Sequence, residues 1–197
     1  MMEGGYLSTP LLFLIQIGFG FYTMLLLLRF LLQATRADFY NPISQMIINV
    51  TAPVLKQFRR FIPGYRGMDI SSLVAAWAAT AIEGLLILAI VGYDGALLAA
   101  LPWALPQLVS LFFSIFIFSI VIQAVMSWFP TTQGHPLQLL VSQIAATVTN
   151  PVRRVFPARS SGVDFTPMLA IIGLKVLKML IMPPLFALFG VPPILQK

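Results

Sequence analysis

The chain has 197 residues, of which 59% are hydrophobic and only 9% are charged, and its formal net charge is +6. A soluble domain of this size cannot cover its surface with so few charges, so the composition predicts an integral membrane protein. Cysteine is absent and His135 is the only histidine, which excludes disulfides and thiolate chemistry and argues against a metal site.

Four apolar segments are long enough to cross a bilayer as helices, at ~1.5 Å per residue over a core of ~30 Å. They cover about residues 10–32, 70–91, 106–129 and 165–189. Residues 96–105 are apolar but contain Pro102, and we expect a short interfacial or re-entrant piece there, with a fifth span as the alternative. The predicted fold class is therefore all-α, a polytopic membrane protein with four transmembrane helices.

Lysine and arginine gather in the loops after the first and third spans, whereas the loop after the second has Asp94 and neither basic residue. Because basic loops stay in the cytoplasm, we expect both of these loops to be cytoplasmic and both termini to lie outside. We expect the basic side chains to contact anionic phospholipid headgroups, with docking of an acidic partner or a specific lipid as the alternative. They are Lys56, Arg59, Arg60, Arg66, Arg153, Arg154 and Arg159.

The chain repeats one phrase in these two loops. VTAPV at residues 50–54 returns as VTNPV at 148–152, and RRFIP at 59–63 returns as RRVFP at 153–157. Gly-x-Asp then follows each time, ending at Asp69 and at Asp164. An even number of crossings separates the copies, so residues 1–95 and 96–197 are predicted to be parallel repeats about a pseudo-two-fold axis along the membrane normal.

Each repeat should carry an amphipathic segment in the cytoplasmic interface, at residues 42–62 and 136–156, because apolar and polar residues separate onto two helical faces. We expect Pro53 and Pro151 to break each segment into two short helices. The predicted helix caps are Asn41, Asp69, Asn150 and Asp164, and His135 is interpreted as a further cap.

Charged residues also fall inside the predicted spans. Glu83 follows Asp69 at the same sequence separation at which Lys178 follows Asp164, so the two occupy equivalent depths. A charge within the bilayer costs at least ~2.5 kcal/mol on the insertion scale. We therefore predict an ion pair between Glu83 and Lys178, with Lys175 as the alternative partner; it is either a structural clasp or a proton- or cation-linked site.

The stretch RADFYNPISQ at 36–45, followed by the first copy of the repeated phrase, resembles the YggT family of bacterial inner-membrane proteins, which is similar to the YlmG proteins. GVDFTP at 162–167 resembles the same motif. The resemblance implies a small inner-membrane protein with two YggT modules and offers no catalytic residues. Its relatives are associated with osmotic stress tolerance, with division and nucleoid arrangement, and with maturation of a plastid cytochrome complex. Haem is not expected here, because His135 alone cannot supply two axial ligands.

An enzyme is the least expected function, since the chain has no cysteine and its one histidine lies in a predicted interfacial loop. We expect a non-catalytic scaffold or assembly factor that uses no cofactor and no metal. The alternative is a component of an ion or small-solute transport system that acts as an oligomer. The expected partners are anionic lipid and another membrane protein or a second copy, and nucleic acid is not expected.

Overall fold

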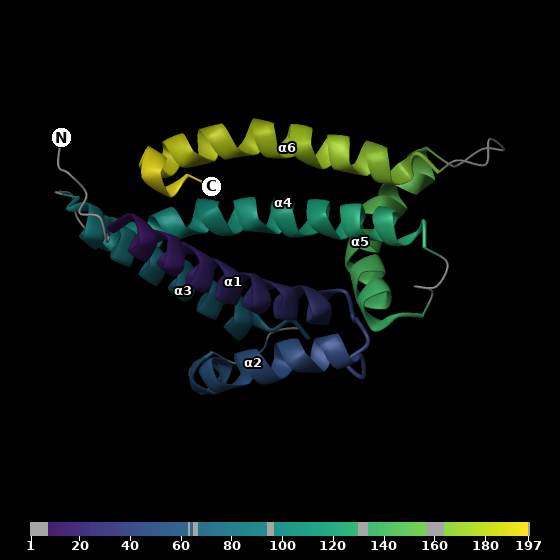
Figure 1. Cartoon of the computed structure of the whole chain (residues 1–197), viewed down its shortest axis with the longest axis horizontal. Coiled ribbons are helices and arrows are strands. Elements are labelled where there is room, and N and C mark those ends of the chain that lie inside the picture. The colour runs from purple at the N-terminus through teal and green to yellow at the C-terminus, as the bar shows by residue number, and fades with distance from the viewer. Residues whose placement is uncertain are drawn as a thin grey trace.

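The structure is a computed structural model that describes residues 8–62, 64, 67–93, 97–129, 134–156 and 164–196. Helices dominate it (Figure 1). The α-helices are α1 (Ser8–Ala34), α2 (Pro42–Phe58), α3 (Ile70–Val91), α4 (Ala100–Met126), α5 (Pro136–Val155) and α6 (Thr166–Phe189). Two short 3-10 helices, η1 (Leu97–Ala99) and η3 (Pro193–Leu195), precede α4 and follow α6.

Four helices, α1, α3, α4 and α6, are long and apolar enough to cross a membrane, with mean hydropathy between 1.9 and 2.5 in their most apolar windows. They coincide with the four predicted spans, which confirms the all-α polytopic fold class. Among the described residues no fifth helix meets the same criteria.

The prediction for residues 96–105 was wrong, because residues 100–105 form the first turns of α4. Pro102 lies in the first turn, where a backbone N–H has no helical acceptor, so its missing donor costs nothing there. Pro106 lies inside the helix and removes one backbone hydrogen bond, which spanning helices tolerate when neighbouring helices pack around the site. Pro106 is indeed buried.

The helices pack in the order α1, α3, α4 and α6, so that α4 contacts both α3 and α6. Figure 1 shows the two repeats as two groups, with α4 and α6 together on one side and α1 and α3 on the other. The contact between repeats is close: Gly84 of α3 faces Ala100 of α4, and the Trp77 indole N–H donates to the Leu101 carbonyl at 2.9 Å. A strict two-fold axis would pack α6 against α1 in the same way, but α6 instead packs on α4 and α5. The predicted two-fold packing is therefore incomplete.

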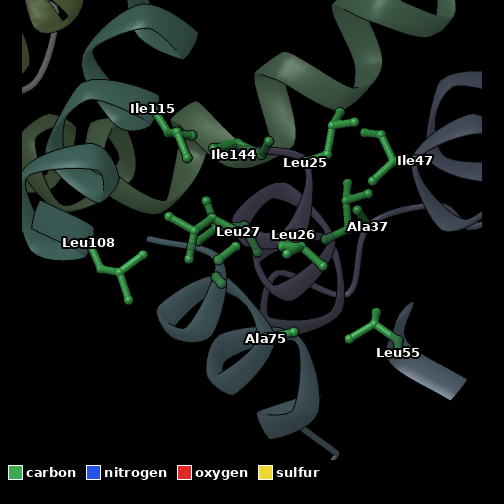
Figure 2. Packing of buried hydrophobic residues seen from close by; sticks show 14 of the residues in the cluster. Leu25, Leu26, Leu27, Ala37, Ile47, Leu55, Ala75, Leu108, Ile115 and Ile144 are labelled. Carbon is green, nitrogen blue, oxygen red and sulfur yellow. The ribbon is translucent and has the colours of Figure 1, made fainter. Parts of the chain in front are cut away.

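Apart from a small cluster of Ile120, Ala145 and Ala170 between α4, α5 and α6, two apolar clusters hold the bundle together. The larger one centres on Leu26 and Leu27 of α1, which are fully buried among residues of α2, α3, α4 and α5 (Figure 2). The smaller one lies at the opposite end of the bundle. It joins residues of α3 and α4 to Val191 and Leu195, which follow α6. There the Trp103 indole N–H donates to the Phe189 carbonyl at 2.7 Å.

The amphipathic segments form α2 and α5, which contact each other at one end of the bundle; α5 crosses that end (Figure 1). Both helices run unbroken through Pro53 and Pro151, so the predicted breaks do not occur and Asn150 lies inside α5 rather than capping a helix. Each proline lies on an exposed face, as do Asn49 and Thr147, whose carbonyls lose their helical donor. Water or headgroups can satisfy those carbonyls, which removes the main penalty.

Candidate functional site

A buried arginine lies near the end of the bundle at which α2 and α5 contact each other. We call this end of the bundle the basic end. Arg29 of α1 donates through Nη1 to the Ile48 carbonyl at 2.8 Å and to Thr51 Oγ1 at 2.7 Å. Its Nε lies 3.5 Å from Asp69 Oδ2. Thr51 in turn donates to the Ile47 carbonyl at 2.7 Å. Arg29 therefore ties α1 to α2 and to the start of α3.

Asp69 lies at the centre of this cluster, with its side chain only 3% exposed. Arg59, the C-cap of α2, also donates to Asp69 Oδ2. Burial by itself raises the pKa of the Asp69 carboxyl, but the hydrogen bond from Arg59 and the two arginine charges outweigh it, so the pKa is lowered. A buried carboxylate is stable only when paired, and here two arginines pair it.

The second repeat reproduces half of this arrangement. Arg153 Nη2 lies 2.8 Å from Asp164 Oδ2, and Asp164 Oδ1 accepts from the backbone N–H of Thr166 at 2.9 Å. The hydrogen bonds from Thr166 lower the pKa of Asp164, with a smaller contribution from Arg153. The Asp164 side chain is 40% exposed, so this pair is far more open to solvent than its counterpart.

The predicted lipid-contacting residues divide into two groups. Arg59 and Arg153 each form an ion pair with an aspartate, although about half of each arginine side chain remains exposed. The second group, Lys56, Arg60 and Arg154, is exposed on the surface of the basic end. Arg66 and Arg159 lie outside the described residues. Contact with lipid stays a prediction for all seven.

Three of the five predicted caps make the expected side-chain bonds. Asn41 Oδ1 accepts from the Ile43 N–H at 2.9 Å, and His135 Nδ1 accepts from the Leu137 N–H at 3.2 Å. Asp164 accepts from the Thr166 N–H at the start of α6, as described above, although Phe165 occupies the N-cap position. Asp69 occupies the N-cap position of α3 but bonds no backbone N–H there, because its carboxylate is engaged by the arginines. The Asn41 Nδ2 also donates to the Pro136 carbonyl at 2.7 Å, which joins the two repeats.

A second polar cluster lies in the middle of the bundle. Glu83 of α3 is 2% exposed. It lines a cavity of about 110 Å³ with residues of α1, α3 and α4. The polar side chains around this cavity are Thr23, Thr80, Glu83, Gln107, Ser110 and Ser114.

Ser114 connects this cavity to Lys178. Lys178 Nζ donates to Ser114 Oγ at 3.2 Å, and both residues line an open groove of about 660 Å³ between α4 and α6. Lys175 lies in the same groove and is exposed. Ser114 of α4 thus accepts from Lys178 and also lines the cavity that holds Glu83. The direct pair between them stays a prediction.

Several residues of these clusters were not predicted from the sequence. Arg29 is the single charge of the first apolar run, and Thr51 belongs to the repeated Val-Thr pair, so both carried a signal. Gln107, Ser110 and Ser114 recur at intervals of three and four residues in an otherwise apolar run, which places them on one face of a helix. That spacing marks the face of α4 turned toward Glu83.

Comparison with known proteins agrees with this repeat architecture. The profile of a family described as CCB3/YggT matches the chain twice, over residues 8–90 and 102–185. The chain belongs to the CCB3/YggT family. The two YggT matches cover α1 to α3 and α4 to α6, so each unit consists of a span, an amphipathic helix and a second span.

The relatives within the YggT family align over nearly the whole chain. An uncharacterised protein of Pseudomonas aeruginosa is 37% identical over 188 residues, which cover 94% of this chain and 95% of the relative. The uncharacterised protein YggT of Escherichia coli K12 is 34% identical over 171 residues, which cover 86% of this chain and 87% of the relative. No solved structure matches. The function of this YggT protein therefore has to be argued from its geometry.

Proposed function

We propose that the protein is a non-catalytic integral membrane scaffold or assembly factor that presents α2 and α5 to lipid and to partner proteins. One observation supports this role. In both repeats an Arg–Asp contact ties the end of the amphipathic helix to the start of the next span. Such a contact holds the helix in a fixed orientation, which a recruiting surface needs.

The outer surface of α2 combines apolar and basic side chains. Met46, Val50 and Val54 are exposed, and Lys56 and Arg60 follow them along the chain. An apolar face flanked by basic residues suits the interface of a bilayer that contains anionic lipid. The proposal therefore places the basic end on the cytoplasmic side of a bacterial inner membrane, with both termini in the periplasm. Assembly of membrane complexes, division and osmotic stress tolerance are the processes that the family resemblance suggests.

The test separates the exposed basic residues from those in the ion pairs. We would change Lys56, Arg60 and Arg154 to Gln together, with Gln57→Ala on the exposed side of α2 as the control. Proteins that co-purify with the full-length chain in mild detergent would be quantified by mass spectrometry. If the protein is a scaffold, the triple variant should lose a partner whose binding to the unchanged protein is weakened by salt, and the Gln57→Ala variant should keep that partner. The melting temperature of the triple variant should stay unchanged. Identical partner profiles in all three proteins would contradict the role.

A second function, as part of an ion or small-solute transport system, is favoured by the polar cluster around Glu83. Buried ionisable groups in spanning helices commonly mark ion or proton pathways. Four spans enclose little space, so such a system would require an oligomer. The test is flux in proteoliposomes of the purified protein: flux that Glu83→Gln abolishes would replace the scaffold proposal, whereas the scaffold should give none.

A further inference from the structure

The two repeats differ at the position of the buried arginine. Arg29 lies as far before the N-cap Asn41 in the sequence as Gln123 lies before the equivalent N-cap His135. The structure supports this correspondence, since Gln123 lines a pocket together with Thr149, Arg153 and Asp164. In the first repeat Arg29 lies among the corresponding residues. The second repeat thus has a neutral, shorter side chain where the first has a guanidinium.

The surroundings of that position are otherwise alike. Thr149 Oγ1 donates to the Ala145 carbonyl at 3.1 Å, just as Thr51 donates to Ile47. This bond uses the hydroxyl hydrogen of Thr149 and leaves the lone pairs of its Oγ1 as acceptors, and in the first repeat the equivalent lone pairs accept from Arg29. Two of the acceptors that hold Arg29 in the first repeat, the threonine hydroxyl and the aspartate, therefore have counterparts in the second.

The space that Arg29 fills in the first repeat is open in the second. The pocket there has a volume of about 690 Å³ and lies between α4, α5 and α6 at the basic end. Asp164, at one side of it, is 40% exposed, whereas Asp69 is 3% exposed. An N–H-bearing cation in this pocket would meet Asp164 and Thr149 as acceptors.

The pocket also offers donors for an anion. Arg153 uses one nitrogen on Asp164, and a guanidinium has five N–H donors, so several remain. Guanidinium groups bind phosphate well. A ligand that carries an ammonium group close to a phosphate would therefore match both charges of the pocket.

An apolar groove continues from the pocket. Ile171 lines both the pocket and the groove of about 660 Å³ between α4 and α6. The groove is lined mainly by apolar side chains, among them Ile117, Phe118 and Val121. Trp128, which is 80% exposed, lies at the pocket, and tryptophan favours the headgroup level of a bilayer. The polar pocket and the mainly apolar groove beside it therefore suit a lipid headgroup and an acyl chain.

We propose that this cavity binds a phospholipid with a primary-ammonium headgroup, of the phosphatidylethanolamine type. Its ammonium takes the place of the Arg29 guanidinium and bonds to Asp164 and Thr149. Its phosphate contacts Arg153, and one acyl chain lies along the groove. This site goes beyond the scaffold role and does not depend on it.

The proposal separates lipids by their chemistry. Phosphatidylcholine carries a quaternary ammonium with no N–H and cannot donate to Asp164 or Thr149. Phosphatidylglycerol has no cation. The full-length protein in detergent would be melted with equal amounts of each lipid. We expect phosphatidylethanolamine to give a saturable rise in Tm of roughly 5 °C, and the other two lipids to give much less. An equal rise with all three would overturn the proposal.

The repeat supplies the decisive variant. Gln123→Arg should place a guanidinium in the pocket as in the first repeat, raise Tm without lipid and abolish the response to phosphatidylethanolamine. Gln57→Arg adds the same charge at an exposed position of the basic end and should keep the response. If Gln123→Arg does not fold, Asp164→Asn takes its place in the test. This variant keeps an oxygen that accepts from Thr166, and it should lose the response to phosphatidylethanolamine.

Two outcomes would overturn the lipid as occupant. A full response retained in both Gln123→Arg and Asp164→Asn would show that the lipid acts elsewhere. An equal rise in Tm with water-soluble O-phosphoethanolamine at the same concentration would show that the pocket binds a free amine and that the groove has no part in binding.

Discussion

The two repeats have the same order of helices but differ in how much of their second span is buried. In the first, half of the most apolar window of α3 is buried, because α1 and α4 cover it on two sides. In the second, only 11% of the corresponding window of α6 is buried. The first repeat fills its polar pocket with its own Arg29, whereas the second leaves that pocket open at Gln123. The first repeat therefore contributes more of the buried core, whereas the second leaves a pocket and a groove open.

The same difference appears in the charges at mid-bundle. Glu83 lines a small cavity of about 110 Å³, and Lys178, at the equivalent position, lines a groove of about 660 Å³. Both positions carry a charged side chain, but the two charges have opposite signs. The duplication has therefore kept the positions of polar groups while allowing their chemistry to diverge.

The largest effect is expected from Arg29→Gln, which gives the first repeat the residue type of the second. The change leaves Asp69 buried with one arginine instead of two, and removing one member of a buried ionic cluster costs ~3 kcal/mol. Arg153→Gln, in the exposed pair of the second repeat, should cost below ~1 kcal/mol. Chemical denaturation of both variants in detergent measures the difference, and equal losses would mean that the two clusters are equivalent.

The next largest effect on stability is expected where α3 packs against α4. A Cβ at Gly84 would lie 3.5 Å from the Cβ of Ala100 and 3.8 Å from Leu195 Cδ1, so Gly84→Leu forces a large side chain between α3 and α4. Overpacking of this kind costs ~1–3 kcal/mol. Met179, the equivalent residue of α6, is 71% exposed, and Met179→Leu should change stability by less than ~0.5 kcal/mol. Melting temperatures decide this comparison, and a tolerated Gly84→Leu would argue against the close contact of the repeats.

A smaller effect tests whether Glu83 and Lys178 are coupled through α4. Glu83→Gln and Lys178→Met should each destabilise the protein, and the double variant should lose ~1 kcal/mol less than their sum. Repeating the cycle in a Ser114→Ala background should shrink that coupling, because Ser114 Oγ accepts from Lys178. Strict additivity in the native background would refute both the predicted pair and the connection through Ser114.

The smallest effect is the dependence of stability on pH. The pKa values of Asp69 and Asp164 are both lowered from the ordinary value of 3.8. A lowered carboxyl pKa contributes stability that is present above the unfolded pKa and is lost as the pH falls through the folded pKa. Stability should therefore fall below pH 3.8, and Asp69→Asn should flatten that fall more than Asp164→Asn. An unchanged acid profile in Asp69→Asn would show that its carboxylate contributes nothing to folding.

Local sequence rules predicted most of the fold. Run length and hydropathy located the four spans, and the Asn-Pro and His-Pro pairs marked the starts of α2 and α5. The rule that proline breaks a helix failed at Pro53 and Pro151, where the exposed surroundings compensate for the lost hydrogen bond. The cluster of Arg29 with Asp69 was not predicted, because its residues come from three helices and their meeting depends on how those helices pack. The difference between the open and the filled pocket has the same origin.

The segment that follows α6 has a consequence for biosynthesis. Val191 and Leu195 belong to the same apolar cluster as Ile87 and Leu88 of α3, so the far end of the first repeat is completed by residues that come after the last span. The chain is synthesised from its N-terminus, so the first two spans are made before those residues are. The first repeat must therefore wait in the bilayer in an unfinished form until α6 has crossed. Errors in inserting the last span should consequently appear as instability of the first repeat.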